Sequence, residues 1–285
     1  MTTRTWTIRE VLDWTTQDFA GRGIESPRLD AELLVAKALG TDRVGLYLDL
    51  NRPLVDRERS AIRPLVERRR EREPVAYILG HRDFYGRRFK VTPDVLIPRP
   101  DTETLIEHAL DCIPEDATCR VLDVGTGSGA IAVTIAAERP LALVTATDIS
   151  DAALKIASAN AEELEVASRI RFERANLLSG AEQFDVIVSN PPYIAESEMM
   201  TLQAEIREHE PVIALEAGED GLDVVRALLA AAEPVTASGA QMLIEIGAKQ
   251  SVSVVDFAAQ HTAWQPVAVY PDLNRIERVV HLRRI

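Results

Sequence analysis

The 285-residue sequence has few cysteines and no long apolar run. Its two cysteines, Cys112 and Cys119, provide neither a disulfide framework nor the spacing of a metal site, so we expect two buried or half-buried thiols. The five histidines also lack metal-site spacing, and no metal is expected. No stretch approaches the roughly 18–20 apolar residues that cross a bilayer, and the N-terminus lacks the apolar core of a signal peptide. We therefore expect a cytoplasmic protein.

Positive charge is scarce in the C-terminal two thirds of the chain. Residues 1–98 contain 18 Lys and Arg against 15 Asp and Glu, whereas residues 99–285 contain 14 against 30. The net charge is therefore +3 in the first part and −16 in the second. Because stable duplex binding requires several neutralised phosphates, a DNA substrate is disfavoured.

Apolar spacing and helix-capping residues predict a small helical bundle domain over residues 1–73. One helix is expected to start after the capping residue Thr7, and another between Ser26 and Gly40 with Leu29 on its inward face. Residues 74–98 are richer in aromatic and glycine residues, and they predict a β-hairpin that links two domains.

Short β-rich runs alternate with helical patterns over residues 99–285. Strands are predicted at residues 120–124, 143–147, 170–173, 184–189, 241–246, 264–270 and 278–282. Helices are predicted at residues 102–112, 130–138, 152–164, 222–232 and 250–260. This alternation is typical of an α/β fold with right-handed crossovers and a mostly parallel sheet.

A glycine-rich loop follows the first strand of this region. Gly125, Gly127 and Gly129 allow the backbone to pass close beneath a ligand, where a side chain would intrude. The spacing is not that of a typical dinucleotide site, and the loop alone is equally compatible with a plain tight turn. Asp148 closes the next strand, where a carboxylate accepts the hydroxyls of a ribose. Its alternative role is to cap the following helix, which Ser150 can also do.

The most specific motif is Asn-Pro-Pro-Tyr at residues 190–193, directly after a predicted strand. The residue types of this motif suit a site that modifies the amide nitrogen of a target molecule. Such a nitrogen is a poor nucleophile, so the planar NH2 group of the target must be held and aimed at an electrophile. The side-chain oxygen of Asn190 and the backbone carbonyl of Pro191 are the predicted acceptors of its two N–H groups. Consecutive prolines fix the carbonyl direction, and Tyr193 is predicted to pack on the flat target. A Pro-Pro turn that merely ends a strand is the alternative interpretation.

The glycine loop and this motif together resemble the class I methyltransferases that modify exocyclic or amide nitrogens with S-adenosylmethionine. A closer resemblance, over nearly the whole chain, is to the release factor glutamine methyltransferases of the PrmC/HemK group. It is carried by residues 26–32, 74–85, 96–103 and 210–215. It implies a Rossmann-like, seven-stranded methyltransferase domain over residues 99–285 that ends in an antiparallel strand. It also implies methyl transfer to the glutamine of the Gly-Gly-Gln tripeptide in class 1 peptide chain release factors.

The site residues follow from the motifs and the resemblance together. The predicted cofactor-binding residues are Gly125, Thr126, Gly127, Ser128, Gly129, Asp148, Ile149, Asn176, Leu177 and Asn190. The predicted catalytic residues are Asn190, Pro191, Pro192 and Tyr193, which also bind substrate together with Arg99. Asn176 stands where relatives often carry an acidic residue that meets the adenine amino group, and its carbonyl keeps an acceptor there.

Three further expectations concern partners. The bundle, with its positive excess, is expected to recognise the protein substrate, and a monomer is expected. An arginine cluster at residues 68–72 is more typical of a solvated helix end than of a partner surface. The alternative functions are an adenine or guanine methyltransferase acting on nucleic acid, and a scaffold that binds cofactor without turnover. The acidic catalytic half disfavours the first, and the intact motif at residues 190–193 disfavours the second.

Overall fold

The computed structural model describes residues 5–178 and 182–285, so residues 1–4 of the expected bundle lie outside it. Contacts divide the chain into two units. The first comprises Met1–His81 together with Gln203–His209, and the second comprises Arg82–Leu202 with Glu210–Ile285. The membership of the short segment at 203–209 in the first unit has no signal in the sequence pattern.

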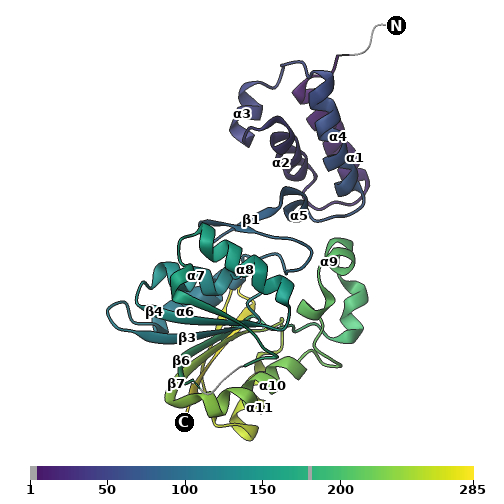
Figure 1. Cartoon of the computed structure of the whole chain (residues 1–285). Helices are drawn as coiled ribbons and strands as arrows, with labels where there is room; N and C mark the ends of the chain where they lie inside the picture. The colour runs from purple at the N-terminus through teal and green to yellow at the C-terminus, as the bar shows by residue number, and fades with distance from the viewer. Residues whose placement is uncertain (1–4, 179–181) are drawn as a thin grey trace. The chain divides into compact units, whose positions relative to one another are not determined.

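The first unit is helical within its described residues (Figure 1). Its helices are α1 (Ile8–Gly21), α2 (Pro27–Leu39), α3 (Arg43–Leu48), α4 (Asp56–Arg70), α5 (Val75–Leu79) and α9 (Ala204–His209). The Thr7 hydroxyl caps α1, as the sequence predicts, and it forms a capping box together with the Glu10 carboxylate. Gly40 ends α2 with φ +66°, the left-handed conformation that favours glycine.

Two expectations for this region are wrong. Leu29 is 40% exposed, whereas Asp30 and Glu32 of the same helix are buried because arginines pair with them. Residues 75–79 form helix α5 instead of part of the hairpin, since Pro74 precedes a helical turn that Gly80 ends in the left-handed conformation. The expected hairpin is confirmed only from β1 (His81–Phe84) to β2 (Arg87–Lys90).

The second unit contains a seven-stranded sheet with helices on both faces. The strands are β3 (Cys119–Val124), β4 (Ala142–Asp148), β5 (Ile170–Arg174), β6 (Phe184–Ser189), β7 (Thr236–Glu245), β8 (Trp264–Pro271) and β9 (Glu277–Arg284). The longer helices are α6 (Thr102–Cys112), α7 (Ala130–Glu138), α8 (Asp151–Glu163), α10 (Asp223–Ala232) and α11 (Ser251–His261). Short 3-10 turns lie at η1 (Ala167–Arg169), η2 (Glu196–Thr201), η3 (Val212–Ala214) and η4 (Glu233–Val235).

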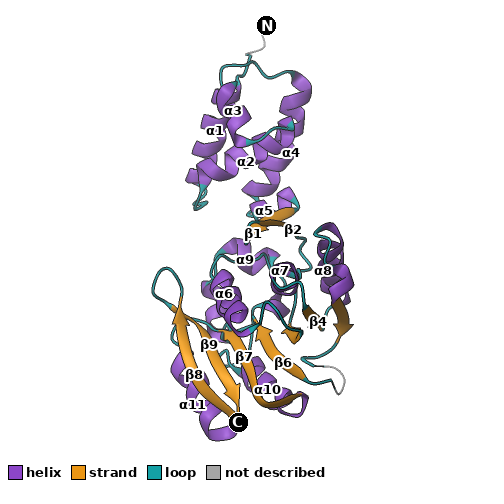
Figure 2. Ribbon diagram, turned by 90° about the vertical axis from the view of Figure 1, so that its left-hand side faces the viewer, coloured by secondary structure: helices purple, strands orange, loops and turns teal. Residues whose placement is uncertain are grey.

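The strand order is β5-β4-β3-β6-β7-β9-β8, and β9 runs antiparallel to both of its neighbours (Figure 2). The chain passes outward from β3 through β4 to β5 and then returns to β6 on the other side of β3. This reversal opens a crevice at the carboxyl ends of β3, β4 and β6. The predicted Rossmann-like architecture with a terminal antiparallel strand is therefore confirmed.

Alternating side chains of the central strands build two separate cores. Val121 of β3 packs with residues of α6 and α7, and its neighbour Leu122 packs with residues of α10 and α11. Figure 1 shows these two pairs of helices on opposite faces of the sheet. Cys119 is buried and Cys112 is half-buried, as expected. None of the helices in the described ranges is long and apolar enough to cross a membrane.

Candidate functional site

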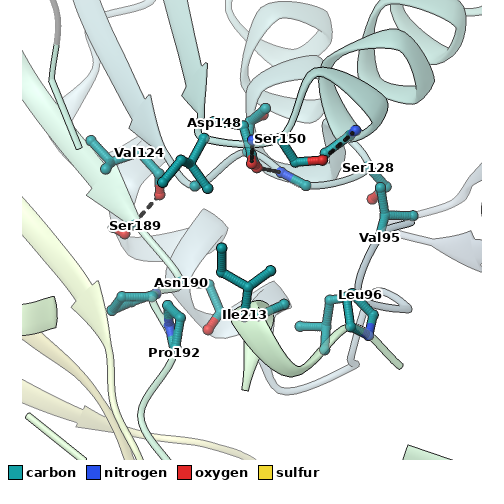
Figure 3. A pocket seen from close by; sticks show the side chains of 18 of the residues that line it. Val95, Leu96, Val124, Ser128, Asp148, Ser150, Ser189, Asn190, Pro192 and Ile213 are labelled. Carbon is teal, nitrogen blue, oxygen red and sulfur yellow. Dashed lines mark hydrogen bonds between the residues drawn. The ribbon is translucent and has the colours of Figure 1, made fainter. Parts of the chain in front are cut away.

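A pocket lies at the carboxyl ends of β3, β4 and β6, entirely within the second unit. Residues from several parts of the sequence line it, among them residues 94–96, 98–99, 124–128, 148–150, 175–177, 189–192, 211 and 213–214. Figure 3 shows Asp148 and Ser150 on one side of the pocket, Asn190 and Pro192 on another, and Val95 with Leu96 on a third. The structure thus brings most of the predicted site residues around one cavity.

The glycine loop after β3 leaves an open cradle. Gly125 and Gly127 have φ of +74° and +55°, and both line the pocket. A Cβ at Gly125 would meet no atom within 4 Å, and one at Gly127 would meet only the Gly125 carbonyl at 4.0 Å. Gly129 has a different role, because a Cβ there would lie 3.0 Å from the Ala157 Cβ of α8. It therefore permits close packing of the loop on α8 and is not a lining residue.

Two buried residues hold this loop in place, and neither was predicted. Asp123 accepts hydrogen bonds from the Thr126 hydroxyl at 2.7 Å and from the Ala132 amide at 3.1 Å. Complete burial raises the pKa of Asp123 to about 7. Asn160 of α8 donates to the Ser128 carbonyl at 2.8 Å. A carboxylate between the apolar residues Leu122 and Val124 was the available sequence signal for Asp123.

Asp148 faces the pocket from the end of β4. Its Oδ2 accepts the Gly127 amide and its Oδ1 accepts the Ser150 amide, both at 2.9 Å. The cap of α8 is formed by the Ser150 hydroxyl, which accepts the Ala153 amide at 3.2 Å. Since a carboxylate has about four acceptor sites, Asp148 retains capacity for ligand hydroxyls.

The remaining predicted cofactor residues lie beside it. Ile149, Asn176 and Leu177 all line the pocket. The Leu177 backbone has φ +71°, and its carbonyl accepts the Thr147 hydroxyl at 2.7 Å. That bond fixes the loop after β5 against the end of β4.

Asn190, Pro191 and Pro192 line the pocket just past β6. The Ser189 hydroxyl donates to the Val124 carbonyl at 2.8 Å, so the motif is fastened to the start of the glycine loop (Figure 3). The Asn190 Nδ2 donates to the Thr102 hydroxyl oxygen at 3.1 Å. Its side-chain oxygen consequently remains an available acceptor.

Tyr193 is not among the residues that line the pocket. Burial, with Glu245 nearby, raises the pKa of its phenol to about 12. Its carbonyl accepts the Gln250 Nε2 at 2.9 Å, and a Cβ at Gly221 would approach that carbonyl to 2.4 Å. Tyr193 therefore fixes the end of the motif outside the pocket. The structure does not bring its ring to a target in the pocket.

Arg99 reaches the pocket on a segment held by Glu210. The Arg99 guanidinium donates to Glu210 Oε1 at 2.5 Å, and the Ile97 amide donates to Glu210 Oε2 at 3.2 Å. The Glu210 side chain is 1% exposed. Ile213, just beyond it in η3, lines the pocket as well. The sequence offered Glu210 only as part of a family-like segment, without a role. The described residues contain no cluster of three or more His, Cys, Asp or Glu that could hold a metal ion.

Comparisons with known proteins point to the same family in both parts of the chain. Residues 10–80 match the family described as the PrmC N-terminal domain, and residues 101–219 match the methyltransferase small domain. The chain is 44% identical to the release factor glutamine methyltransferase of Geobacter sulfurreducens, over 96% of each chain. It is 41% identical to that of Rhodopirellula baltica, over 98% of this chain and 97% of the relative. A methyltransferase structure from Pyrococcus furiosus shares the fold, with a TM-score of 0.52 and 16% identity over 70% of this chain and 90% of the other.

Proposed function

Because the chain belongs to the release factor glutamine methyltransferase family, we propose that it methylates the glutamine side-chain amide of the Gly-Gly-Gln tripeptide in class 1 peptide chain release factors. The enzyme is an S-adenosylmethionine-dependent methyltransferase. The observation that carries the proposal is that Asp148 and the glycine loop line one side of a pocket and Asn190 lines another side of the same pocket. The reaction would support translation termination, which places it in the cytoplasm.

The pocket residues suit S-adenosylmethionine. The cradle at Gly125 and Gly127 admits a ligand that a Cβ would displace, and Asp148 has free acceptor sites for two ribose hydroxyls. The Asn176 side-chain oxygen is our candidate partner for the adenine amino group. When bound, the cofactor supplies an electrophilic methyl group.

The chain's own contribution is to hold and polarise the target amide. We assign the Asn190 side-chain oxygen and the Pro191 carbonyl as acceptors of its two N–H groups. Fixed acceptors of this kind also stabilise the positive charge that develops on the nitrogen. Arg99, held at the pocket by Glu210, is our candidate contact to the backbone around the target glutamine.

We further propose that the bundle at residues 1–73 recognises the release factor, the hairpin region at 74–98 links it, and residues 99–285 carry the chemistry. Trp14 supports this role because it is 46% exposed beside a groove lined by residues of α1 and α4. The Arg70 guanidinium lies 5.9 Å from the centre of its ring. Exposed Trp and Arg are the residue types that dominate binding energy at interfaces. We propose a monomeric enzyme without a DNA substrate, in keeping with the −16 charge of residues 99–285.

Mass spectrometry of release factor incubated with the protein and labelled cofactor tests the proposal. One methyl group should appear on the Gly-Gly-Gln peptide, and none on a release factor whose target glutamine is replaced by alanine. An adenine- or guanine-containing oligonucleotide serves as the competing substrate. Methylation of the oligonucleotide with none on release factor would contradict the proposal.

A further inference from the structure

The Thr102 hydroxyl links the proposed target-binding residue to a buried carboxyl. Thr102 begins α6 and is 4% exposed. Its oxygen accepts the Asn190 Nδ2 at 3.1 Å, and its other side-chain partner is the carboxyl of Glu245. A hydroxyl has only one hydrogen to donate, so the direction of one bond constrains the direction of the other.

Glu245 ends β7 with 1% of its surface exposed. Its Oε2 is buried and has no hydrogen-bond partner among the described residues. It does not line the pocket, so it touches neither proposed ligand directly. An acidic side chain buried in an apolar strand is costly and calls for a reason beyond packing.

Donor and acceptor chemistry determines how this chain of groups is arranged. An ionised carboxylate only accepts, so Thr102 must donate to Glu245 and accept from the Asn190 NH2. The Asn190 oxygen then faces the pocket. A protonated Glu245 can instead donate to Thr102, which frees the threonine hydrogen for the Asn190 oxygen. The amide would then turn its NH2 toward a target that is itself a donor.

We propose that Thr102 and Glu245 are positioning residues that set which end of the Asn190 amide faces the substrate. This inference rests on the proposed function, because it concerns the acceptor that holds the target NH2. It deepens that function by assigning the orientation of Asn190 to two residues outside the Asn-Pro-Pro-Tyr motif. Only the outward-facing oxygen is productive.

We call the chain of groups from Glu245 through Thr102 to Asn190 the relay. Titration of Glu245 in this relay makes turnover depend on pH. Burial raises the pKa of Glu245 to about 7. The hydrogen bond from Thr102 and the guanidinium groups of Arg278 and Arg99 oppose this rise, whereas the nearby Asp101 carboxylate adds to it. The phenol of Tyr193 is a further titratable neighbour. Because the ionised form is the productive one, kcat should fall as the pH drops through about 7.

Two threonine variants test the relay, with a third as control. Thr102→Val removes the hydroxyl and should lower kcat about tenfold with little change in cofactor affinity, as expected for one hydrogen bond. Thr102→Ser restores the hydroxyl and should recover most of kcat. Thr134→Val changes another fully buried threonine, on α7 and outside the pocket, and should leave kcat unchanged.

The variant Glu245→Gln removes the titrating carboxyl. In Glu245→Gln the fall of kcat through about pH 7 should disappear. The side-chain NH2 signals of Asn190 in a nitrogen-15 NMR spectrum, identified by their loss in Asn190→Asp, give a second measurement without substrate. They should shift with a midpoint near pH 7 in the wild type, and should not titrate in Glu245→Gln.

The two kinds of measurement separate this inference from the proposed function. If the wild type leaves release factor unmethylated, the proposed function fails, while the Asn190 signals still decide the relay. Wild-type kcat in Thr102→Val overturns the inference. So do Asn190 signals that stay constant across this pH range in the wild type, even if Thr102→Val fails to fold.

Discussion

Arg69 of α4 donates a hydrogen bond to Glu205 of α9 at 2.9 Å, across 136 positions of sequence. The same guanidinium donates to Asp30 of α2 at 2.7 Å, and its side chain is 6% exposed. Arg72 reinforces the arrangement with a bond to Glu205 at 2.7 Å. Buried charges therefore hold the segment at 203–209 within the helical unit.

Replacement of Arg69 should destabilise this unit strongly. Arg69→Met leaves the buried Asp30 carboxylate without its partner, which typically costs about 3–5 kcal/mol of unfolding free energy, and leaves Glu205 paired only with Arg72. Urea unfolding followed by tryptophan fluorescence would measure it, because Trp6 and Trp14 belong to this unit. The control is Arg88→Met, whose pair with Asp83 is exposed on both sides and should contribute less than about 1 kcal/mol. Equal effects of the two changes would contradict the role given to burial.

Removal of the Asp148 carboxylate should weaken cofactor binding. Asp148→Ala leaves the ribose hydroxyls without a charged partner and should lose about 1–3 kcal/mol of binding free energy by calorimetry. Asp151→Ala is a matched control, since Asp151 pairs with Arg174 on the surface and does not line the pocket. Unchanged affinity in Asp148→Ala would remove Asp148 from the cofactor site.

Trp14 provides the test of substrate recognition by the bundle. Trp14→Ala should raise KM for release factor about tenfold or more, equivalent to at least about 1.4 kcal/mol, with normal cofactor affinity. Leu48→Ala is the control, because Leu48 of α3 is 82% exposed and does not line the groove beside Trp14. If KM for release factor is unchanged in Trp14→Ala, the docking surface lies elsewhere.

The fold was readable from the sequence because its signals are local. Short β-rich runs and capping residues give the strands and helices of the second unit within one or two residues for most elements, such as β6 (Phe184–Ser189). Helix α5 was missed because aromatic residues and glycines are also typical of hairpins. The arginines at 68–72 were misread for a different reason. Asp18, Asp30 and Glu205 pair with these arginines from distant parts of the sequence, and no local pattern reveals such partners.

The site residues that lie in a motif were predictable from the sequence. The residues that hold those motifs in place from other segments were mostly not predictable. Gly125, Asp148 and Asn190 lie in motifs at strand ends, and the structure places all three at the pocket. Glu210 and Gln250 support the site from segments without a strand-end motif. Glu245 did carry a sequence signal, since it is a charge at the end of an apolar strand.

Glu245 should make the folding stability depend on pH. Burial raises its pKa in the folded protein from 4.5 to about 7. A raised pKa means that the folded state binds the proton more tightly, so this stabilisation is complete below about pH 4.5 and is lost as the pH rises through about 7. Urea unfolding at several pH values should show the wild type losing up to about 3 kcal/mol relative to Glu245→Gln over this range. A constant difference between the two proteins would show that the carboxyl does not titrate there.

Asn190 is the residue on which the proposed chemistry depends most directly. Asn190→Ala removes the acceptor that holds the target amide and should lower kcat more than it affects cofactor affinity, because alignment matters most in the transition state. Full activity of Asn190→Ala on a Gly-Gly-Gln substrate would eliminate the mechanism.

Asn190→Asp is the more informative change. It keeps an acceptor of nearly the same shape but loses the NH2 that donates to Thr102. In Asn190→Asp, the Thr102 hydroxyl has a single hydrogen to donate to two carboxylates, the one introduced by the substitution and that of Glu245, so the geometry of the acceptor is no longer defined. The added negative charge attracts a cationic cofactor and stabilises its charged ground state, which opposes methyl transfer. We expect preserved or tighter cofactor binding by calorimetry together with reduced kcat. A variant that binds cofactor normally and methylates release factor at the wild-type rate would show that the NH2 of Asn190, and hence its orientation, has no part in catalysis.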